Sequence, residues 1–381
     1  MKNWMTQEEA CDALGVRKQT LYAYVSRGRI EVQGDPDNAN RNLYRSTDIA
    51  ALVKRRSLGR ARKNIAASTM SWGEPIIDTS ISTIVRGRLY YRGRDAVQLA
   101  ASSTLEEAAR LLWNTTGPPH FPSFEPVPFE GPISARIYAA LACDAAYDRA
   151  QAARDLAQRV DQAAALVGRL ASNFVELRAD DGPLHLRIAN AWGAEHHADL
   201  LRRVLVLLAD QELTSSSFAA RVAASTGASL GACMVAGLAA FSGPLHGNAI
   251  VRVLQFMDDA KRSGTETVVR TLIAAGEPLP GFGHELYPQG DPRAADLLAS
   301  FQAPDAARDL IDRVERLTGK LPAIDIALAA LVEHCALPEG AAFALFSIAR
   351  SVGWMAHSIE QITQGCLLRP RAHYVGPAAL D

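Results

Sequence analysis

Two histidines and one aspartate, each on a short segment rich in glycine or proline, are the residues of this 381-residue chain best suited to chemistry. His246 lies in Gly-Pro-Leu-His-Gly, His284 ends Gly-Phe-Gly-His, and Asp325 follows Leu-Pro-Ala-Ile. Glycine and proline interrupt helices, so we expect these side chains on loops or helix ends, where backbone donors are free and a ligand can approach closely. Two imidazoles and one carboxylate would then be available for acid-base chemistry.

The composition is that of an ordinary globular protein, with 48% apolar residues, 21% charged residues and a formal net charge of −1. No run approaches the roughly 20 apolar residues of a membrane helix, and the N-terminus shows no signal-peptide core, so we expect a cytoplasmic protein without a membrane partner. The five cysteines are scattered and lack C-x-x-C spacing, which argues against disulfides and against a zinc site. We interpret them as buried, inert thiols.

A second candidate for metal binding, the adjacent pair His196 and His197, is also rejected. Consecutive helical residues point about 100° apart and cannot chelate as an i, i+4 pair would. We interpret both as helix-surface residues and expect no metal and no redox cofactor.

Residues 1–58 predict a small winged helix-turn-helix domain. Thr6 followed by Glu9 is a capping box that begins a helix at Gln7, which Gly15 ends, and a second helix is predicted from about Lys18 to Arg27. The β-prone pieces 30–32 and 43–44 flank a polar stretch, 33–42, and predict a hairpin wing. Ser46 then caps a helix through Lys54.

This block resembles the MerR/excisionase-type winged helix-turn-helix, and the resemblance implies DNA binding. The candidate contacts lie on or beside the second helix: Arg17, Lys18, Thr20, Tyr22 and Arg27. The alternative is a packing or oligomerisation module, because exposed helices commonly carry Lys and Arg without touching nucleic acid. Residues 59–72 are predicted to be a basic linker.

The rest of the chain predicts an almost entirely α-helical body. Short β-prone pieces at 76–77, 81–84 and 89–91 come first. Apolar residues then recur at helical spacing through 105–113, 134–145, 152–175, 197–209, 217–241, 294–301 and 340–359. The small side chains of 227–241 suit either a buried core helix or a helix packed between two subunits.

Five motifs in this body together resemble the citrate synthase family, and they span about 300 residues in the family's order. They are Gly87-Arg88 with Tyr91-Arg92-Gly93-Arg94-Asp95, the segment from Leu208 to Gly227 running into His246, Gly281 to His284 with Asp291-Pro292-Arg293, Arg350 to His357, and Arg369-Pro370-Arg371. The resemblance implies an all-α homodimer. Its large domain would comprise 73–248 and 340–381 and its small domain 249–339, with the active site between them.

The resemblance also implies a reaction, the condensation of acetyl-CoA with oxaloacetate to citrate and CoA, with acetyl-CoA as a substrate and no other cofactor. By motif position, Asp325 would be the base that takes a proton from the thioester methyl group, and His246 would donate to the thioester oxygen. His284 would polarise the ketone of oxaloacetate. The expected carboxylate-binding residues are Gln211, Arg293, Arg350 and Arg369, with Arg369 reaching across the dimer.

Several positions depart from the family's pattern. Gln211 stands where a histidine is common, and it can donate a hydrogen bond but cannot carry charge. Glu285, Pro288 and Ala323 replace residues expected near CoA. Two other functions are therefore kept as alternatives. One is a 2-methylcitrate synthase using propionyl-CoA, which differs from acetyl-CoA by a single methylene group that sequence motifs do not resolve. The other is a DNA-binding regulator whose synthase-like body senses a metabolite.

Overall fold

The computed structural model describes residues 4–26, 29–35, 38–50, 52, 77–147, 155–177, 182–372 and 374–376. The chain divides into two compact units, Met1–Asp78 and Thr79–Asp381. The predicted linker 59–72 lies outside the described residues, as do Arg27 and Lys54. Among the described residues, no helix combines the length and the apolar character needed to span a membrane.

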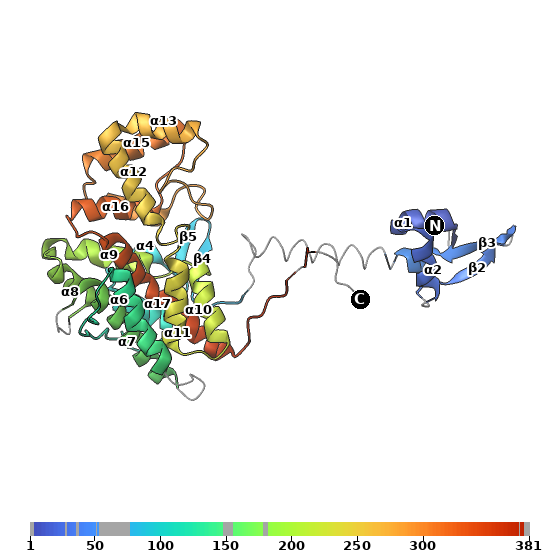
Figure 1. Cartoon of the computed structure of the whole chain (residues 1–381), viewed down its shortest axis with the longest axis horizontal. Helices are drawn as coiled ribbons and strands as arrows, with labels where there is room; N and C mark the ends of the chain where they lie inside the picture. Colours follow the sequence, from blue (N-terminus) through green and yellow to red (C-terminus); the bar gives the residue numbers. More distant parts are fainter. Residues whose placement is uncertain are drawn as a thin grey trace. The chain divides into compact units, whose positions relative to one another are not determined.

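The N-terminal unit contains the predicted helix-turn-helix and a three-stranded antiparallel sheet in the order β1-β3-β2 (Figure 1). Its elements are β1 (Trp4–Met5), α1 (Gln7–Leu14), α2 (Lys18–Ser26), β2 (Val32–Asp35) and β3 (Asn38–Arg45). The capping box is present, because Thr6 Oγ1 accepts from the Glu9 N–H and Glu9 Oε2 accepts from the Thr6 N–H. The unit has a small core of its own: Ala10, Leu14, Leu21, Ile30, Tyr44 and Ile49.

The hairpin wing predicted around residues 33–42 is present. Val32 pairs with Tyr44, Gln33 with Leu43 and Gly34 with Asn42, so both strands run into the polar stretch. Backbone hydrogen bonds sustain such pairing even when side chains on the solvent face are polar. A register shift between Gly34 and Asp35 bends the end of the hairpin. Residues 46–50 are helical, as expected after Ser46.

The second unit, called the body below, is helical apart from one small antiparallel sheet, as the sequence predicted. The sheet has the order β4-β5-β6, with β4 (Ser82–Val85), β5 (Arg88–Tyr91) and β6 (Arg94–Asp95). The first half of the helices comprises α4 (Ala96–Ala100), α5 (Leu105–Trp113), α6 (Ile133–Tyr147), α7 (Leu156–Val175), α8 (Leu184–Ala191), the 3₁₀ helix η2 (Glu195–His197), α9 (Ala198–Leu208) and α10 (Ser215–Ser225). The second half comprises α11 (Leu230–Phe241), α12 (Ala249–Ser263), α13 (Thr265–Ala274), α14 (Pro292–Ala299), α15 (Asp305–Thr318), α16 (Ile324–His334) and α17 (Ala341–Gln364).

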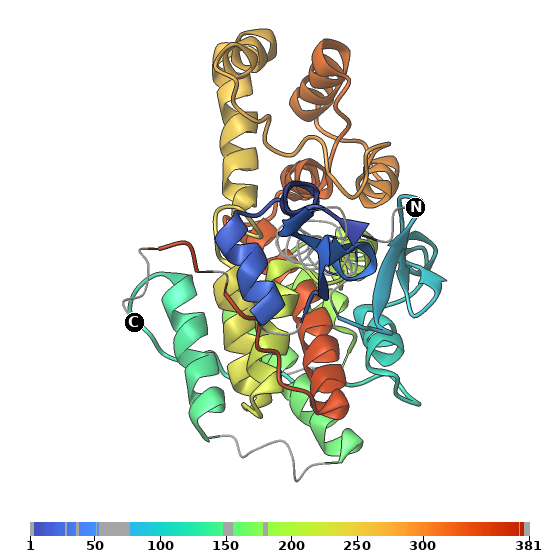
Figure 2. The same ribbon diagram turned by 90° about the vertical axis from the view of Figure 1, so that its right-hand side faces the viewer.

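Helix α17 is the centre of the body. It packs against α5, α7, α9, α10 and α11, and nearly all of its side chains are buried. At the other end of the body, α12, α13 and α15 form a separate group, with α16 between that group and α17 (Figures 1 and 2). The segments between these two groups carry the candidate catalytic residues.

Two predictions about helices need correction. The pattern over 217–241 is two helices, because Gly227 adopts a φ of +81° and Ser229 caps α11 by accepting from the Ala232 N–H. Helical structure also extends beyond the predicted segments, to α8, α12, α13, α15 and α16.

Helix α11 packs one face of small residues very closely. A side chain at Gly231 would lie 2.7 Å from the Ala145 backbone nitrogen, and one at Gly237 would lie 2.9 Å from the Trp354 ring. This face is therefore part of the core, which agrees with the interpretation of 227–241 as a buried core helix. The opposite face retains partial exposure at Ala232, Val235 and Ala236, so packing between subunits stays a prediction.

Candidate active site

Arg293 is held at the start of α14 by the carboxylate two residues before it. Asp291 Oδ1 accepts from the Arg293 backbone N–H and from Nε, both at 3.0 Å, and Oδ2 accepts from Nη2 at 2.8 Å. Both side chains are fully buried. Burial alone would raise the pKa of Asp291, but the charge and hydrogen bonds of Arg293 hold it below its usual value. Arg293 Nη1 donates to Gln211 Oε1 at 2.7 Å, which fixes the orientation of that amide.

Arg350, on α17, is buried without a carboxylate in direct contact. Its Nε donates to the Leu208 carbonyl at 2.9 Å, and its guanidinium stands 5.1 Å from the centre of the Phe346 ring. Its Nη2 is buried and has no hydrogen-bond partner among the described residues. Burial lowers the pKa of Arg350, with the charge of Asp210 acting against that shift. A carboxylate ligand would supply the acceptor that this buried Nη2 lacks.

His284 and Gln211 meet through two nitrogen atoms. His284 Nδ1 accepts from the Leu286 backbone N–H at 3.1 Å, so the neutral imidazole carries its proton on Nε2. That Nε2 lies 3.2 Å from Gln211 Nε2, which is also a donor because Gln211 Oε1 faces Arg293. Two donors therefore face each other. An oxygen atom placed beside both would accept from both, so this pair is suited to a ketone or carboxylate oxygen.

His246 lies in the turn between α11 and α12 and is positioned by Ser216 on α10. His246 Nε2 is 2.8 Å from Ser216 Oγ, and the same hydroxyl oxygen accepts from Trp354 Nε1 at 3.0 Å. The imidazole ring also packs edge-on against Phe241, and Gly247 leaves no room for a side chain there. His246 Nδ1 has no hydrogen-bond partner among the described residues, so one ring nitrogen remains for a ligand.

Both histidines are held in the neutral form. Burial lowers the pKa of His246 to about 4, and Arg350 adds to this shift. Burial lowers the pKa of His284 to about 4 as well, with Arg293 acting in the same direction and Asp291 against it. A neutral imidazole can donate a hydrogen bond to a developing oxyanion without adding a buried charge to the site.

Asp325 stands in the first turn of α16, and its loop pairs with the loop of His284. The Gly283 N–H donates to the Leu321 carbonyl at 2.9 Å, and the Ala323 N–H donates to the Gly281 carbonyl at 2.8 Å. Burial raises the pKa of Asp325, while Arg293 and Arg350 oppose the shift. The carboxylate makes no side-chain hydrogen bond among the described residues, and a raised pKa makes it a stronger base.

Behind these residues lies a buried polar network that the sequence did not reveal. Asp210, next to Gln211, accepts from Ser82 Oγ and lies 3.4 Å from His357 Nε2. His357 Nδ1 is 3.2 Å from Arg221 Nη1, and Arg221 pairs with Glu360 at 2.7 Å. The backbone of α17 approaches closely here, since the Gly353 N–H donates to the Ala209 carbonyl at 3.1 Å. The network holds the backbone that presents Gln211.

Three residues in and behind the site were not identified from sequence as functional. Ser216 lies in the run Thr214–Ser217, whose pattern suggests only a helix cap, and Thr214 does cap α10. Trp354 and His357 belong to the motif from Arg350 to His357 and are both fully buried. Trp354 also donates to Ser216, and His357 lies between Asp210 and Arg221. The sequence signal that could have indicated Ser216 is the run of four hydroxyl-bearing residues that begins at Thr214.

A small cavity of about 180 Å³ lies beside His284, and Pro288 is the one departure from the family's pattern in its lining. It is lined by His284, Tyr287, Pro288, Lys320 and Pro322, among others. Lys320 is exposed at its edge, and Glu285 is exposed in the adjoining loop. One cation, Lys320, therefore lines the same cavity as His284.

Among the remaining sequence candidates, Arg369 is exposed beyond the end of α17, and its contribution to the site of a second copy stays a prediction. Arg17, Lys18, Thr20 and Tyr22 are exposed on or beside α2 in the other unit, and Arg27 lies outside the described residues.

The cysteines and the paired histidines differ in part from expectation. Cys233 and Cys335 are buried, but Cys143 and Cys366 are exposed, so the interpretation of all five as buried thiols was wrong. His196 is exposed as expected, whereas His197 is half-buried and its ring lies 5.1 Å from that of His334 in a tilted arrangement. The described part of the chain holds no group of three or more residues able to bind a metal ion.

Comparisons with known proteins agree with this arrangement. A family model described as the C-terminal domain of citrate synthase matches residues 132–371, and a helix-turn-helix domain model matches residues 4–57. The protein named "Putative citrate synthase 2" of Mycobacterium tuberculosis is 32% identical over 326 residues, which cover 76% of this chain and 87% of that protein. The citrate/2-methylcitrate synthase of Bacillus subtilis is 35% identical over 187 residues, covering 46% of this chain and 50% of the relative.

Solved structures show the same fold. The citrate synthase of Thermoplasma acidophilum, in a ternary complex with carboxymethyl coenzyme A and oxaloacetate, matches with a TM-score of 0.71 and 27% identity over 82% of this chain and 97% of that one. The citrate synthase of Thermotoga maritima matches with a TM-score of 0.68 and 27% identity over 81% of this chain and 96% of that one. The chain therefore belongs to the citrate synthase family and is an enzyme of that type, with a helix-turn-helix domain at its N-terminus.

Proposed function

We propose that this enzyme condenses acetyl-CoA with oxaloacetate to give citrate and CoA, with His246, His284 and Asp325 as its catalytic residues. The observation that carries the proposal is the unpaired buried Nη2 of Arg350 on the same site as the facing donors of Gln211 and His284. A keto acid with two carboxylates supplies the acceptors that these groups lack. Oxaloacetate is such an acid.

The roles follow from the chemistry of each group. Asp325 takes a proton from the thioester methyl carbon, while His246 donates a hydrogen bond to the thioester oxygen as negative charge develops there. The resulting enol carbon attacks the ketone carbon of oxaloacetate, and His284 donates to the ketone oxygen. Water then cleaves the thioester and releases CoA. The neutral histidines and the raised pKa of Asp325 support these roles.

Arg293 and Arg350 bind the carboxylates in this proposal, and Gln211 donates to the ketone oxygen beside His284. Arg369 completes the site from a second copy in a homodimer. The small, partly exposed face of α11 at Ala232, Val235 and Ala236 supports close packing of two copies. The catalytic cleft would lie between a large domain, 73–248 with 340–381, and a small domain, 249–339. Arg369→Gln should lower turnover, because each active site of the dimer would lose the guanidinium that the other copy supplies. Equal activity of this variant and wild type would contradict the assignment.

The test of the main proposal is release of free CoA thiol, with citrate identified by mass spectrometry. Asp325→Asn should lower kcat by at least about 1,000-fold, because loss of the base leaves the weakly acidic methyl group protonated. Asp312→Asn, which changes an exposed aspartate on α15, is the matched control and should keep full activity. Full turnover by Asp325→Asn would refute the assignment.

The choice of acyl group is tested in the same assay. We propose acetyl-CoA as the preferred donor, although relatives that include 2-methylcitrate synthases are about as similar. One methylene changes binding by about 1–3 kcal/mol, so kcat/KM for acetyl- and propionyl-CoA should be compared directly. A higher value for propionyl-CoA would identify a 2-methylcitrate synthase.

We further propose that residues 1–58 bind DNA. The exposed Arg17, Lys18, Thr20 and Tyr22 on or beside α2, together with the match to a helix-turn-helix family, support this function. A gel shift should weaken steeply with salt and should be lost when Arg17, Lys18 and Arg27 are all changed to alanine. Arg308→Ala and Arg316→Ala, which remove exposed charges from the body, are the control. If condensation fails while oxaloacetate still binds, the body serves as the metabolite sensor of a regulator.

A further inference from the structure

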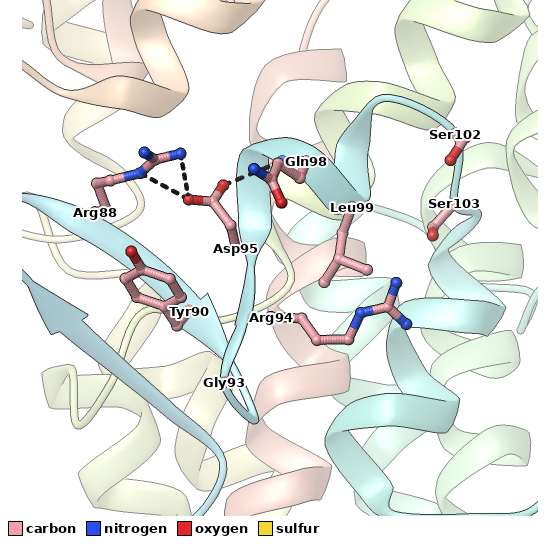
Figure 3. A pocket seen from close by; sticks show the side chains of 9 residues that line it. All are labelled: Arg88, Tyr90, Gly93, Arg94, Asp95, Gln98, Leu99, Ser102 and Ser103. Carbon is pink, nitrogen blue, oxygen red and sulfur yellow. Dashed lines mark hydrogen bonds and ion pairs between the residues drawn. The ribbon is translucent and has the colours of Figure 1, made fainter.

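A second cavity, of about 360 Å³, lies beside the small sheet of the body and contains none of the proposed catalytic residues. Its walls come from β5, β6, α4 and the loop that follows α4 (Figure 3). The side chains that matter for a ligand are Arg94, Gln98, Ser102, Ser103 and Tyr90. This volume is within the range of sites for small molecules.

The acidic residue of the cavity is already satisfied. Asp95 Oδ1 accepts from the backbone N–H groups of Val97 and Gln98, at 2.9 and 3.1 Å. Its Oδ2 accepts from Arg88 Nε at 2.8 Å and pairs with Arg88 Nη2 at 2.7 Å. Because Arg88 offsets the charge of Asp95, this pair does not repel an anion.

The other polar groups of the cavity lack partners. The side chains of Arg94, Gln98, Ser102 and Ser103 make no hydrogen bond or ion pair among the described residues. In Figure 3 the guanidinium of Arg94 extends from β6 below Leu99 toward Ser103. The cavity thus presents one uncompensated positive charge together with hydroxyl and amide donors.

The loop that carries the two serines is held rigidly from behind. Arg202 Nη1 donates to the carbonyls of Ala100 and Ser103, at 2.9 and 2.7 Å, and Nη2 donates to that of Ala101 at 3.2 Å. Arg202 is itself buried and paired with Asp199. A loop fixed in this way can bind a ligand without losing much conformational entropy.

We propose that this cavity binds a phosphate monoester of a small polar metabolite, at a site separate from the one used for condensation. The phosphate would accept from Arg94 and from the hydroxyls of Ser102 and Ser103, a donor set that matches a tetrahedral dianion. The Tyr90 ring and Leu99 form the less polar wall, against which the organic part packs. The inference stands whether or not the proposed condensation is correct, because no residue is shared between the two sites.

The test is calorimetric titration of the full chain with ribose 5-phosphate, inorganic phosphate and ribose. Nucleotides are avoided because acyl-CoA itself contains an adenosine diphosphate. We expect ribose 5-phosphate to bind once per chain, more tightly than inorganic phosphate, and to bind more weakly as salt is raised. Arg94→Gln, and separately Ser102→Ala with Ser103→Ala, should each weaken binding by about tenfold or more. Arg316→Gln on α15 is the matched control and should leave binding unchanged.

Each other outcome overturns the proposal. Absence of binding refutes it, and unchanged binding by Arg94→Gln places the ligand elsewhere, including on the basic N-terminal unit. Displacement by saturating oxaloacetate would show that ribose 5-phosphate occupies the catalytic site. Equal affinity for inorganic phosphate would show that the cavity recognises an anion alone and not a phosphate monoester. Arg94 is exposed, so the variant should fold, and circular dichroism with CoA release checks this.

Discussion

Replacing Arg350 by methionine should make the ligand-free enzyme more stable while it loses its substrate. Arg350 is buried with one unpaired Nη2 and no carboxylate in contact. A buried charge without a directly paired carboxylate costs several kcal/mol, most of which the nearby charge of Asp210 offsets, and an unsatisfied donor costs about 1–3 kcal/mol. Loss of the bond to the Leu208 carbonyl and of the contact with Phe346 returns about 1–2 kcal/mol. The expected net gain is about 1–3 kcal/mol.

Arg293→Met is the matched control, because Arg293 is equally buried but is fully paired with Asp291. Removing one partner of a buried ion pair costs about 3–5 kcal/mol, so the two substitutions should change stability in opposite directions. Asp210 loses a nearby positive charge when Arg350 is changed, but it keeps Ser82 and His357. The contrast therefore tests whether the difference in pairing, rather than burial itself, decides stability.

The assay is thermal unfolding with and without oxaloacetate. Arg350→Met should raise the midpoint by about 2–6 °C in the absence of ligand, whereas Arg293→Met should lower it. Oxaloacetate should stabilise wild type by mass action and fail to stabilise either variant. Loss of two charge-assisted hydrogen bonds should raise KM for oxaloacetate by at least about 100-fold. If Arg350→Met lowers the midpoint as much as Arg293→Met does, the reasoning about unpaired burial is wrong.

Three further substitutions or conditions test the rest of the site. Ser216→Ala removes the partner of His246 Nε2, so kcat should fall by about 10–100-fold with little change in KM for oxaloacetate. Ser215→Ala, at an exposed position, should leave kcat unchanged, and a fall in both variants would indicate damage to α10 instead. Gly353→Ala places a methyl group 2.3 Å from Asp210 Oδ1, so it should lower the free energy of unfolding by about 1–3 kcal/mol and raise KM for oxaloacetate. Gly117→Ala, whose methyl group meets nothing within 4 Å, should change neither quantity. An unchanged KM in Gly353→Ala would show that the Asp210 network does not position Gln211. The pKa values of His246 and His284 are about 4 in the folded chain against an ordinary 6.5, so the unfolded chain takes up protons first as pH falls. The contribution of these two histidines to the free energy of unfolding should therefore be constant above about pH 6.5 and decline between about pH 6.5 and 4. Unfolding midpoints should therefore depend less on pH in the double variant His246→Gln, His284→Gln, and an unaltered pH dependence would contradict the assignment.

Much of the architecture could be predicted because its signals are local. The capping box at Thr6 and Glu9 and the apolar pattern over 105–113 depend on residues within one or two helical turns, and both elements are present. The glycine-flanked histidines were likewise expected away from helix interiors, and both lie on turns. The break between α10 and α11 was missed, because alanine and glycine on both sides continue an apolar pattern through a turn that only the φ of Gly227 defines.

What could not be predicted depends on contacts between distant segments. Trp354 and Ser216 are separated by 138 residues, and no local pattern indicates that they share a hydrogen bond. The same is true of Arg221 and His357, which are 136 residues apart. The contrast between Arg293 and Arg350 is also invisible in sequence, because both are arginines in family-like motifs and only the folded chain shows which of them lacks an anion.

The meeting of two donors at Gln211 and His284 has a consequence for selectivity. Without ligand, each N–H faces another N–H, so the empty site already bears the cost of an unmade hydrogen bond. A ketone oxygen removes that cost on entry, whereas a methylene group at the same position leaves both donors facing apolar surface. Sites of this kind can reject an analogue that lacks the oxygen by about 10⁴-fold or more. The enzyme would thus distinguish oxaloacetate from succinate by their difference at one carbon atom, even though both carry the same pair of carboxylates.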